Sequence, residues 1–138
     1  MSRRNAREAA LQALFQLEFG QLSALEALSY ALGVTTLTEK DEGYARLVLA
    51  KAVQKWEKTE ALITEYAEKW SLERLARVDR AILRLSIAEM LLNAPDTPVG
   101  VVIDEGLELA KEYSTDESSR FIHGILGSVA SSLGWVET

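Results

Sequence analysis

The sequence predicts an all-α fold, a compact bundle of about seven helices, and three observations support it. Apolar residues recur at spacings of three and four almost from end to end, as on the buried faces of amphipathic helices. No alternating apolar and polar run bounded by turn signals predicts a strand. Only two prolines occur, Pro95 and Pro98, and the 138 residues suit one domain spanning residues 1–138.

The N-terminal third of the chain carries clear helix boundaries. A first helix is expected from about Arg3 to Phe19, ended by Gly20. Ser23 and Glu26 then have the spacing of a capping box, which predicts a second helix that Gly33 stops. The segment VTTLT after this glycine is expected to be a loop.

Two helices are expected between about Glu39 and Trp70, with a poorly marked junction near Thr59. Each shows an apolar stripe at helical spacing: Tyr44, Val48, Ala52 and Trp56 in the first, and Leu62, Ile63, Tyr66 and Trp70 in the second. Both helices should therefore bury one face.

The segment VDRAILRLSIAEMLLN, residues 78–93, is apolar on most of its circumference, so it is expected to be the central helix. The breaker NAPDTP follows it, with Thr97 suited to cap the next helix and Pro98 suited to its first turn. That next helix is expected over residues 98–113.

The last helix is expected over residues 116–133. Ser114, with Glu117 three residues later, has the spacing of a capping box and indicates its start. Gly124 and Gly127 lie inside this helix and do not follow a strand, so they do not form a phosphate-binding loop. Close helix packing is the simpler explanation for both glycines.

Composition restricts the possible functions. Cysteine is absent, which excludes disulfides, a thiolate nucleophile and thiolate metal ligands. The chain has 15 basic and 21 acidic residues and a net charge of -6, so any RNA site must be local or helped by a partner. No apolar run predicts a signal peptide or a membrane span, so we expect a cytoplasmic protein without a membrane association.

The sequence offers no convincing catalytic or metal site. His123 is the only histidine, and nothing suggests that it belongs to a catalytic triad or a zinc site. Asp104, Glu105 and Glu108 are better explained as a solvated acidic face, because neighbouring side chains on a helix diverge. We therefore expect no enzyme, no cofactor and no metal.

The first helix carries an aromatic residue that its core face does not explain. At about 100° per residue, small apolar side chains share one face; they are Ala6, Ala9, Ala10, Ala13, Leu14 and Leu17. Phe15 falls nearly opposite them, within about 20° of Arg4, and Arg7 flanks it. Arginines beside an exposed aromatic suit single-stranded RNA, and the alternative is that a neighbouring helix or a dimer partner covers Phe15.

The last helix shows a weaker anomaly of the same kind. Its apolar stripe consists of Ile122, Ile125, Leu126, Val129 and Leu133. Phe121 lies about 100° from the centre of the stripe, beside Glu117, and should be partly exposed. Packing at the edge of the core is the alternative explanation.

Three segments, in this order, resemble the NusB family of bacterial transcription antitermination factors: RRNAREAALQALF, VDRAILRLSIAEML and IDEGLELAKEYSTDESSRFIHGIL. The resemblance implies an all-helical fold in two small helical subdomains. It implies a non-catalytic role in binding the single-stranded boxA element of ribosomal RNA leader transcripts. The implied partners are NusE, a small-subunit ribosomal protein, and through that pair other Nus factors and RNA polymerase.

The resemblance also implies site residues. The RNA-binding positions of the family fall on Arg3, Arg4, Arg7, Phe15 and Phe121. Asp79 and Glu117 match positions expected to contact a partner or to lie next to the RNA. The chain departs from the family pattern at Asn5, Asp104, Gly106 and His123, and the loss of a basic residue at Asn5 should weaken phosphate contacts.

Two alternatives to this function remain. One is a helical protein-interaction module, or a homodimer that hides the arginine and phenylalanine face. The other is enzymatic, because NusB-like domains also occur fused to RNA methyltransferases. An all-helical chain of 138 residues leaves no room for the parallel sheet of a methyl-donor domain, so we expect a binding protein.

Overall fold

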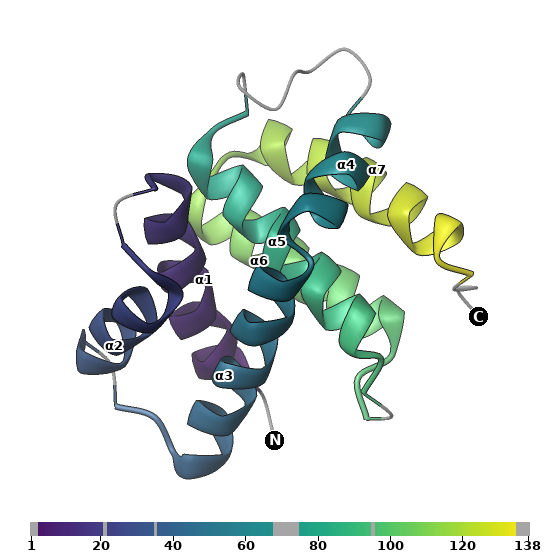
Figure 1. Ribbon diagram of the computed structural model, residues 1–138. Helices are drawn as coiled ribbons and strands as arrows, with labels where there is room; N and C mark the ends of the chain where they lie inside the picture. Colours follow the sequence, from purple (N-terminus) through teal and green to yellow (C-terminus); the bar gives the residue numbers. More distant parts are fainter. Residues whose placement is uncertain (1–2, 21, 35, 68–74, 95, 135–138) are drawn as a thin grey trace.

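The computed structural model describes residues 3–20, 22–34, 36–67, 75–94 and 96–134 (Figure 1). Within those ranges the chain forms seven α-helices and no strand, which confirms the all-α prediction. The helices are α1 (Arg4–Glu18), α2 (Ala24–Val34), α3 (Glu39–Gln54), α4 (Trp56–Tyr66), α5 (Arg77–Leu92), α6 (Val99–Tyr113) and α7 (Asp116–Ser132).

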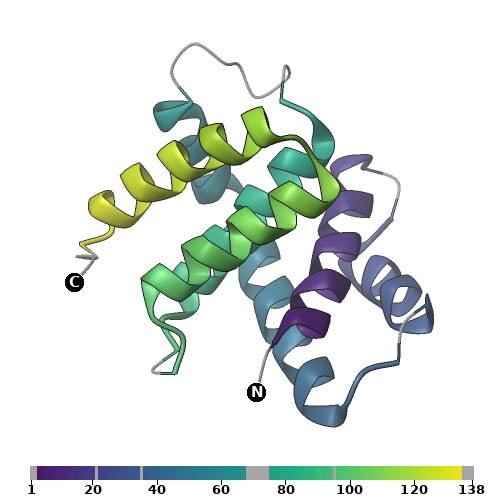
Figure 2. The same cartoon turned by 180° about the vertical axis from the view of Figure 1, so that it is seen from behind.

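The helices form two groups around α5. In both views α1, α2 and α3 lie together on one side, and α4, α6 and α7 lie on the other (Figures 1 and 2). Helix α5 packs against α1 and α3 of the first group and against all three helices of the second. The sequence explains this central position, because α5 offers apolar side chains to neighbours on several sides. Its fully buried apolar residues include Ala81, Ile82, Leu83, Leu85 and Ile87.

Several predicted boundaries are confirmed. Gly20 has a φ of 72°, a left-handed conformation that ends α1 at little steric cost. The capping box of α2 is formed, since the Ser23 backbone N–H donates to Glu26 Oε1 and the Glu26 N–H donates to Ser23 Oγ. Gly33 is the penultimate residue of α2 and does not stop it, so the boundary differs by one residue.

Other predictions of helix boundaries were wrong. The junction of α3 and α4 lies at Lys55 and not near Thr59, which is inside α4. Trp70, the predicted end of the second of these helices, lies outside the described residues. Helix α6 begins at Val99 without a side-chain cap from Thr97, and the cap of α7 is Thr115. Ser114 fails as the cap because its hydroxyl donates to Asp79 instead.

The glycines divide into two kinds. A Cβ on Gly106 would lie 2.6 Å from Ser86 Oγ and 3.3 Å from Leu126 Cδ1, so Gly106 allows α5 and α6 to approach closely. A Cβ on Gly124 or Gly127 would meet nothing within 4 Å. The close-packing explanation for these two glycines was therefore wrong.

Candidate nucleic-acid interface

The buried part of the circumference of helix α1 is wider than the face of small residues that the sequence predicted. The predicted alanines and Leu14 are buried, but so are Leu11 and Arg7, and Leu17 is only partly buried. The buried arc covers about 200° at 100° per residue, because α1 packs against α2, α3 and α5 together. Phe15 lies just outside the arc, half-buried against the core edge.

Arg7 belongs to the core and not to an RNA-facing surface. Its side chain is 4% exposed, and its Nε donates to both carboxylate oxygens of Glu89, at 3.0 and 2.9 Å. Burial disfavours the charged guanidinium, but the hydrogen bond and charge of Glu89 outweigh it and raise the pKa of Arg7. A direct phosphate contact needs an accessible guanidinium, so the structure corrects the prediction for Arg7.

Tyr44 completes this buried network. Its hydroxyl donates to Glu89 Oε1 at 2.5 Å. Burial and the negative charge of Glu89 raise the pKa of Tyr44 to about 12, so the phenol keeps its proton at neutral pH. The network of Arg7, Glu89 and Tyr44 thus joins α1, α5 and α3.

Arg3 is tied to the turn between α5 and α6. It donates from Nη1 to Thr97 Oγ1 at 2.5 Å and from Nη2 to Asp96 Oδ2 at 2.8 Å. Its guanidinium also lies 4.0 Å from the centroid of the Tyr44 ring, a cation–π contact. The phosphate contact expected of Arg3 stays a prediction, and it would require Arg3 to leave these partners.

Arg4 is surrounded by carboxylates. It pairs with Glu112, and carboxylate oxygens of Glu8 and Glu105 each lie 3.9 Å from one of its nitrogens. Its side chain is 29% exposed, so a phosphate can reach it. The contact expected of Arg4 also stays a prediction, and it would exchange a carboxylate for a phosphate.

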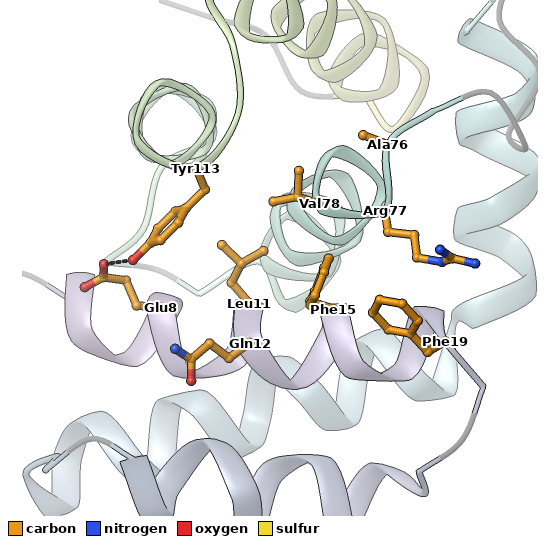
Figure 3. A pocket seen from close by; sticks show the side chains of 9 residues that line it. All are labelled: Glu8, Leu11, Gln12, Phe15, Phe19, Ala76, Arg77, Val78 and Tyr113. Atoms are coloured by element: carbon orange, nitrogen blue, oxygen red, sulfur yellow. Dashed lines mark hydrogen bonds between the residues drawn. The ribbon is translucent and has the colours of Figure 1, made fainter.

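The C-terminal half of α1 borders an apolar groove against α5 (Figure 3). The groove has a volume of about 620 Å³ and is lined by Glu8, Leu11, Gln12, Phe15, Phe19, Ala76, Arg77, Val78 and Tyr113. Phe15 and Phe19 meet edge to face with ring centroids 5.1 Å apart. The guanidinium of Arg77 covers the Phe19 ring at 4.5 Å from its centroid. This end of the groove therefore joins aromatic surface to a positive charge.

The opposite end of the groove is acidic. Tyr113 donates its hydroxyl to Glu8 Oε2 at 2.5 Å, and Figure 3 shows this pair across the groove from Arg77. The hydrogen bond to Glu8, followed by partial burial, raises the pKa of Tyr113 to about 12. Tyr113 is therefore a neutral donor at physiological pH, and it leaves the negative charge on Glu8.

Phe121 lines a second hollow of about 390 Å³, together with Leu75, Ala76, Asp79, Thr115, Glu117, Ser118 and Arg120. Its side chain is partly buried, as predicted. Ala76 lines both hollows, so the surfaces around Phe15 and Phe121 adjoin at the start of α5. The structure thus places on neighbouring surfaces the two aromatic residues that the sequence singled out.

Asp79 serves the fold at this junction. Its carboxylate accepts hydrogen bonds from Ser114 Oγ at 2.7 Å and Ser118 Oγ at 2.8 Å, and the residue is 5% exposed. It fixes the start of α5 to the turn between α6 and α7, and its predicted contact with a partner or with RNA stays a prediction. Glu117 is exposed beside the Phe121 hollow, and its predicted role stays a prediction.

Sequence reasoning missed Phe19, Arg77 and Tyr113. Phe19 lies four residues after Phe15, and this spacing signals a shared helix face. Nothing in the sequence indicates that Arg77 and Tyr113, from other helices, meet that face.

No group of three or more histidine or acidic side chains among the described residues is placed to hold a metal ion. No helix in the described part of the chain is long and apolar enough to span a membrane.

Comparison with known proteins extends these observations. The model of the NusB family matches residues 4–131. The transcription antitermination protein NusB of Symbiobacterium thermophilum is 44% identical over 137 residues, covering 94% of this chain and 89% of that protein. The solved structure of T. maritima NusB is 39% identical with a TM-score of 0.86, covering 95% of this chain and 92% of that one.

A second solved structure contains a complex. It holds the antitermination factors NusB and NusE with double-stranded RNA; the matching chain is 25% identical with a TM-score of 0.84, covering 94% of this chain and 96% of that one. The family match covers most of the present sequence, and the fold agrees with the solved relatives. This chain belongs to the NusB family.

Proposed function

We propose that this protein is a non-catalytic, RNA-binding transcription antitermination factor. It acts with NusE, a small-subunit ribosomal protein, to bind the single-stranded boxA element of ribosomal RNA leader transcripts. Through that pair it joins other Nus factors and RNA polymerase and helps to suppress premature termination. The observation that carries the proposal is the adjacency of the Phe15 and Phe121 surfaces in a chain of the NusB family.

The two aromatic surfaces suit unpaired bases. Single-stranded RNA exposes the faces of its bases, and each base that stacks on an aromatic side chain contributes about 1–3 kcal/mol. Phe15 and Phe121 are each partly buried, so their rings are held in position while one part stays accessible. Ala76, at the start of α5, lines both hollows, so a single-stranded RNA that passes over Ala76 reaches both of them.

The α1 arginines have a smaller role in this proposal. Arg3 and Arg4 lie at the opposite end of α1 from Phe15, where both already pair with carboxylates. They serve as weaker phosphate contacts, because each must exchange a carboxylate for a phosphate. Arg7 holds α1 against α5 through Glu89 and does not touch the RNA.

The proposed partner compensates for the net charge of -6. A basic ribosomal protein on this acidic surface is favoured by electrostatic complementarity. It would also supply positive charge that the chain itself lacks near the RNA. A solved complex of NusB and NusE with double-stranded RNA, whose matching chain is 25% identical to this one, supports the choice of NusE as the partner.

A binding measurement tests the proposal. Fluorescently labelled boxA RNA and a scrambled RNA of equal length are titrated with the protein at saturating NusE. We expect tighter binding of boxA, and equal affinities would contradict the proposal. Solution mass measurements on the protein alone test the alternative, a homodimer that hides the Phe15 surface.

A further inference from the structure

We infer that Glu105 and Glu112 of α6 determine RNA specificity by occupying Arg4 of α1. Their carboxylates compete with phosphates for this guanidinium, and they lower the affinity for RNA that lacks boxA more than the affinity for boxA. The inference rests on the proposed function and adds two specificity-determining residues to it. Neither residue needs to touch the RNA.

The surroundings of Arg4 hold more negative charge than its guanidinium neutralises. Its Nη2 pairs with Glu112, its Nη1 lies 3.9 Å from Glu105 Oε2, and its Nε lies 3.9 Å from Glu8 Oε2. Three carboxylates around one guanidinium leave this cluster with a net negative charge. A phosphate that approaches Arg4 is therefore repelled by the carboxylates as well as attracted by the guanidinium.

The pair of Arg4 with Glu112 can open, unlike the buried pair of Arg7 with Glu89. The Arg4 and Glu112 side chains are 29% and 49% exposed, whereas those of Arg7 and Glu89 are 4% and 1% exposed. An exposed ion pair contributes little to stability and is screened by salt, so a purely structural role would give it little effect. Its larger effect should be on ligands that compete for the same guanidinium.

Helix α6 carries further acidic residues, and these provide a matched comparison. Glu105 and Glu112 are seven residues apart, close to two helical turns, so both project from one face of α6 toward Arg4. Asp104 and Glu108 are exposed on the same helix, and Glu108 lies 3.9 Å from Lys111. Removing either pair of acids changes the net charge equally, but only the first pair contacts Arg4 in the ion pairs described above.

Competition for Arg4 affects different RNAs unequally. Binding that does not depend on sequence comes from phosphate contacts, so any RNA can use an available arginine. In the proposed function boxA also stacks on Phe15 and Phe121, and Phe15 lies toward the other end of α1 from Arg4. Occupation of Arg4 by carboxylates therefore removes affinity that any RNA would gain and leaves the stacking contribution of boxA. A penalty on the wrong ligand is one of the two ways to gain specificity.

Three variants test the inference. The first is the double variant Glu105→Gln with Glu112→Gln, which removes two charges and keeps the shape of both side chains. The matched control is Asp104→Asn with Glu108→Gln, which changes the net charge of -6 by the same amount. The third adds Arg4→Ala to the first.

Circular dichroism first establishes that the variants keep the helicity of the wild type. NusE affinity is then measured without RNA. The affinities for boxA and for scrambled RNA of equal length are measured at saturating NusE over a range of salt concentrations.

We expect Glu105→Gln with Glu112→Gln to bind scrambled RNA about fivefold more tightly than the wild type at about 0.1 M salt. The slope of log affinity against log salt should steepen by about 0.7, the value for one gained phosphate contact with a single strand. The affinity for boxA should rise less, so the preference for boxA falls. The control should show a smaller gain, and Arg4→Ala should reduce the gain of the first variant to that of the control.

Several results would overturn the inference while the wild type still prefers boxA. The first variant could bind scrambled RNA no better than the control does, or its gain could survive Arg4→Ala. An equal gain for both RNAs would contradict a role in specificity, and a loss of NusE affinity without RNA would assign these carboxylates to the protein partner. If the wild type itself does not prefer boxA, the proposed function fails instead.

Discussion

The two ends of helix α1 have different surroundings. At the closed end, which we define by Arg3, Arg4 and Arg7, each arginine pairs with at least one carboxylate from another helix or turn. At the open end, defined by Phe15 and Phe19, aromatic rings border a groove, and the guanidinium of Arg77 lies over the Phe19 ring.

The difference shows that an arginine-rich segment does not by itself predict which guanidinium groups are free of ion pairs. A guanidinium paired with a carboxylate must give up that pair before it binds a phosphate, and a buried pair resists separation most strongly. The closed end should therefore determine stability, and the open end should determine RNA affinity. The variants below separate the two effects, beginning with the largest.

Glu89→Ala at the closed end should have the largest effect. It leaves the Arg7 guanidinium buried without a counter-charge, which should lower the free energy of unfolding by about 3–5 kcal/mol. Urea denaturation followed by circular dichroism measures this change.

A double variant, Arg7→Met with Glu89→Met, is the matched control. It removes both charges and keeps the volume apolar, so its stability should lie much closer to the wild type. A loss below about 1 kcal/mol in Glu89→Ala would show that the pair does not hold the closed end together.

Phe15→Ala at the open end should separate binding from folding. We expect a loss of about 1–3 kcal/mol in boxA binding at saturating NusE, because one stacking surface disappears. Helicity should change little, since Phe15 lies at the core edge. Unchanged RNA affinity would remove Phe15 from the binding surface.

Tyr44→Phe should destabilise the closed end by about 1.5 kcal/mol, because Glu89 loses a hydroxyl donor. The pKa of Tyr44 is about 12 in the folded protein, against about 10 for an unperturbed tyrosine. The stability that this difference contributes is present below pH 10 and is lost as pH rises through 12.

Denaturation of the wild type and of Tyr44→Phe between pH 9 and pH 12 measures this dependence. The variant should show a shallower decline of stability over that range. Tyr113→Phe is a useful comparison, since Tyr113 also has a raised pKa of about 12 but is exposed. Equal slopes for the wild type and Tyr44→Phe would contradict the assignment.

Arg4→Ala should have the smallest effect. Its ion pairs are partly exposed, so their loss should change stability by about 0–1 kcal/mol. Its loss should weaken boxA binding less than Phe15→Ala does. A larger loss than that of Phe15→Ala would show that Arg4 is a principal phosphate contact.

The sequence was sufficient to predict the helices and most of the core. Apolar spacing identified the central position of residues 78–93 and the buried stripe of the last helix, because these follow from the periodicity of one helix. The caps were harder to predict. Ser114 and Thr115 both suit a helix start, and only the position of Asp79 decides which hydroxyl is free to cap α7.

The candidate site was predictable only in part. A helical wheel identifies Phe15 but treats α1 in isolation, so it could not show that contacts with three neighbouring helices bury Arg7. Likewise, Arg77 and Phe19 come together only through the packing of α5 against α1. Long-range packing thus decides which arginines are available to RNA.

The most direct test compares two variants in one assay, the affinity for boxA RNA at saturating NusE. We predict that Phe15→Ala weakens binding about fivefold or more, and that the double variant Arg3→Ala with Arg4→Ala weakens it less. The contradictory result is a greater loss in the double variant, with a salt slope lowered by about 1.4, the value for two lost phosphate contacts. That result would place the RNA on the closed end of α1.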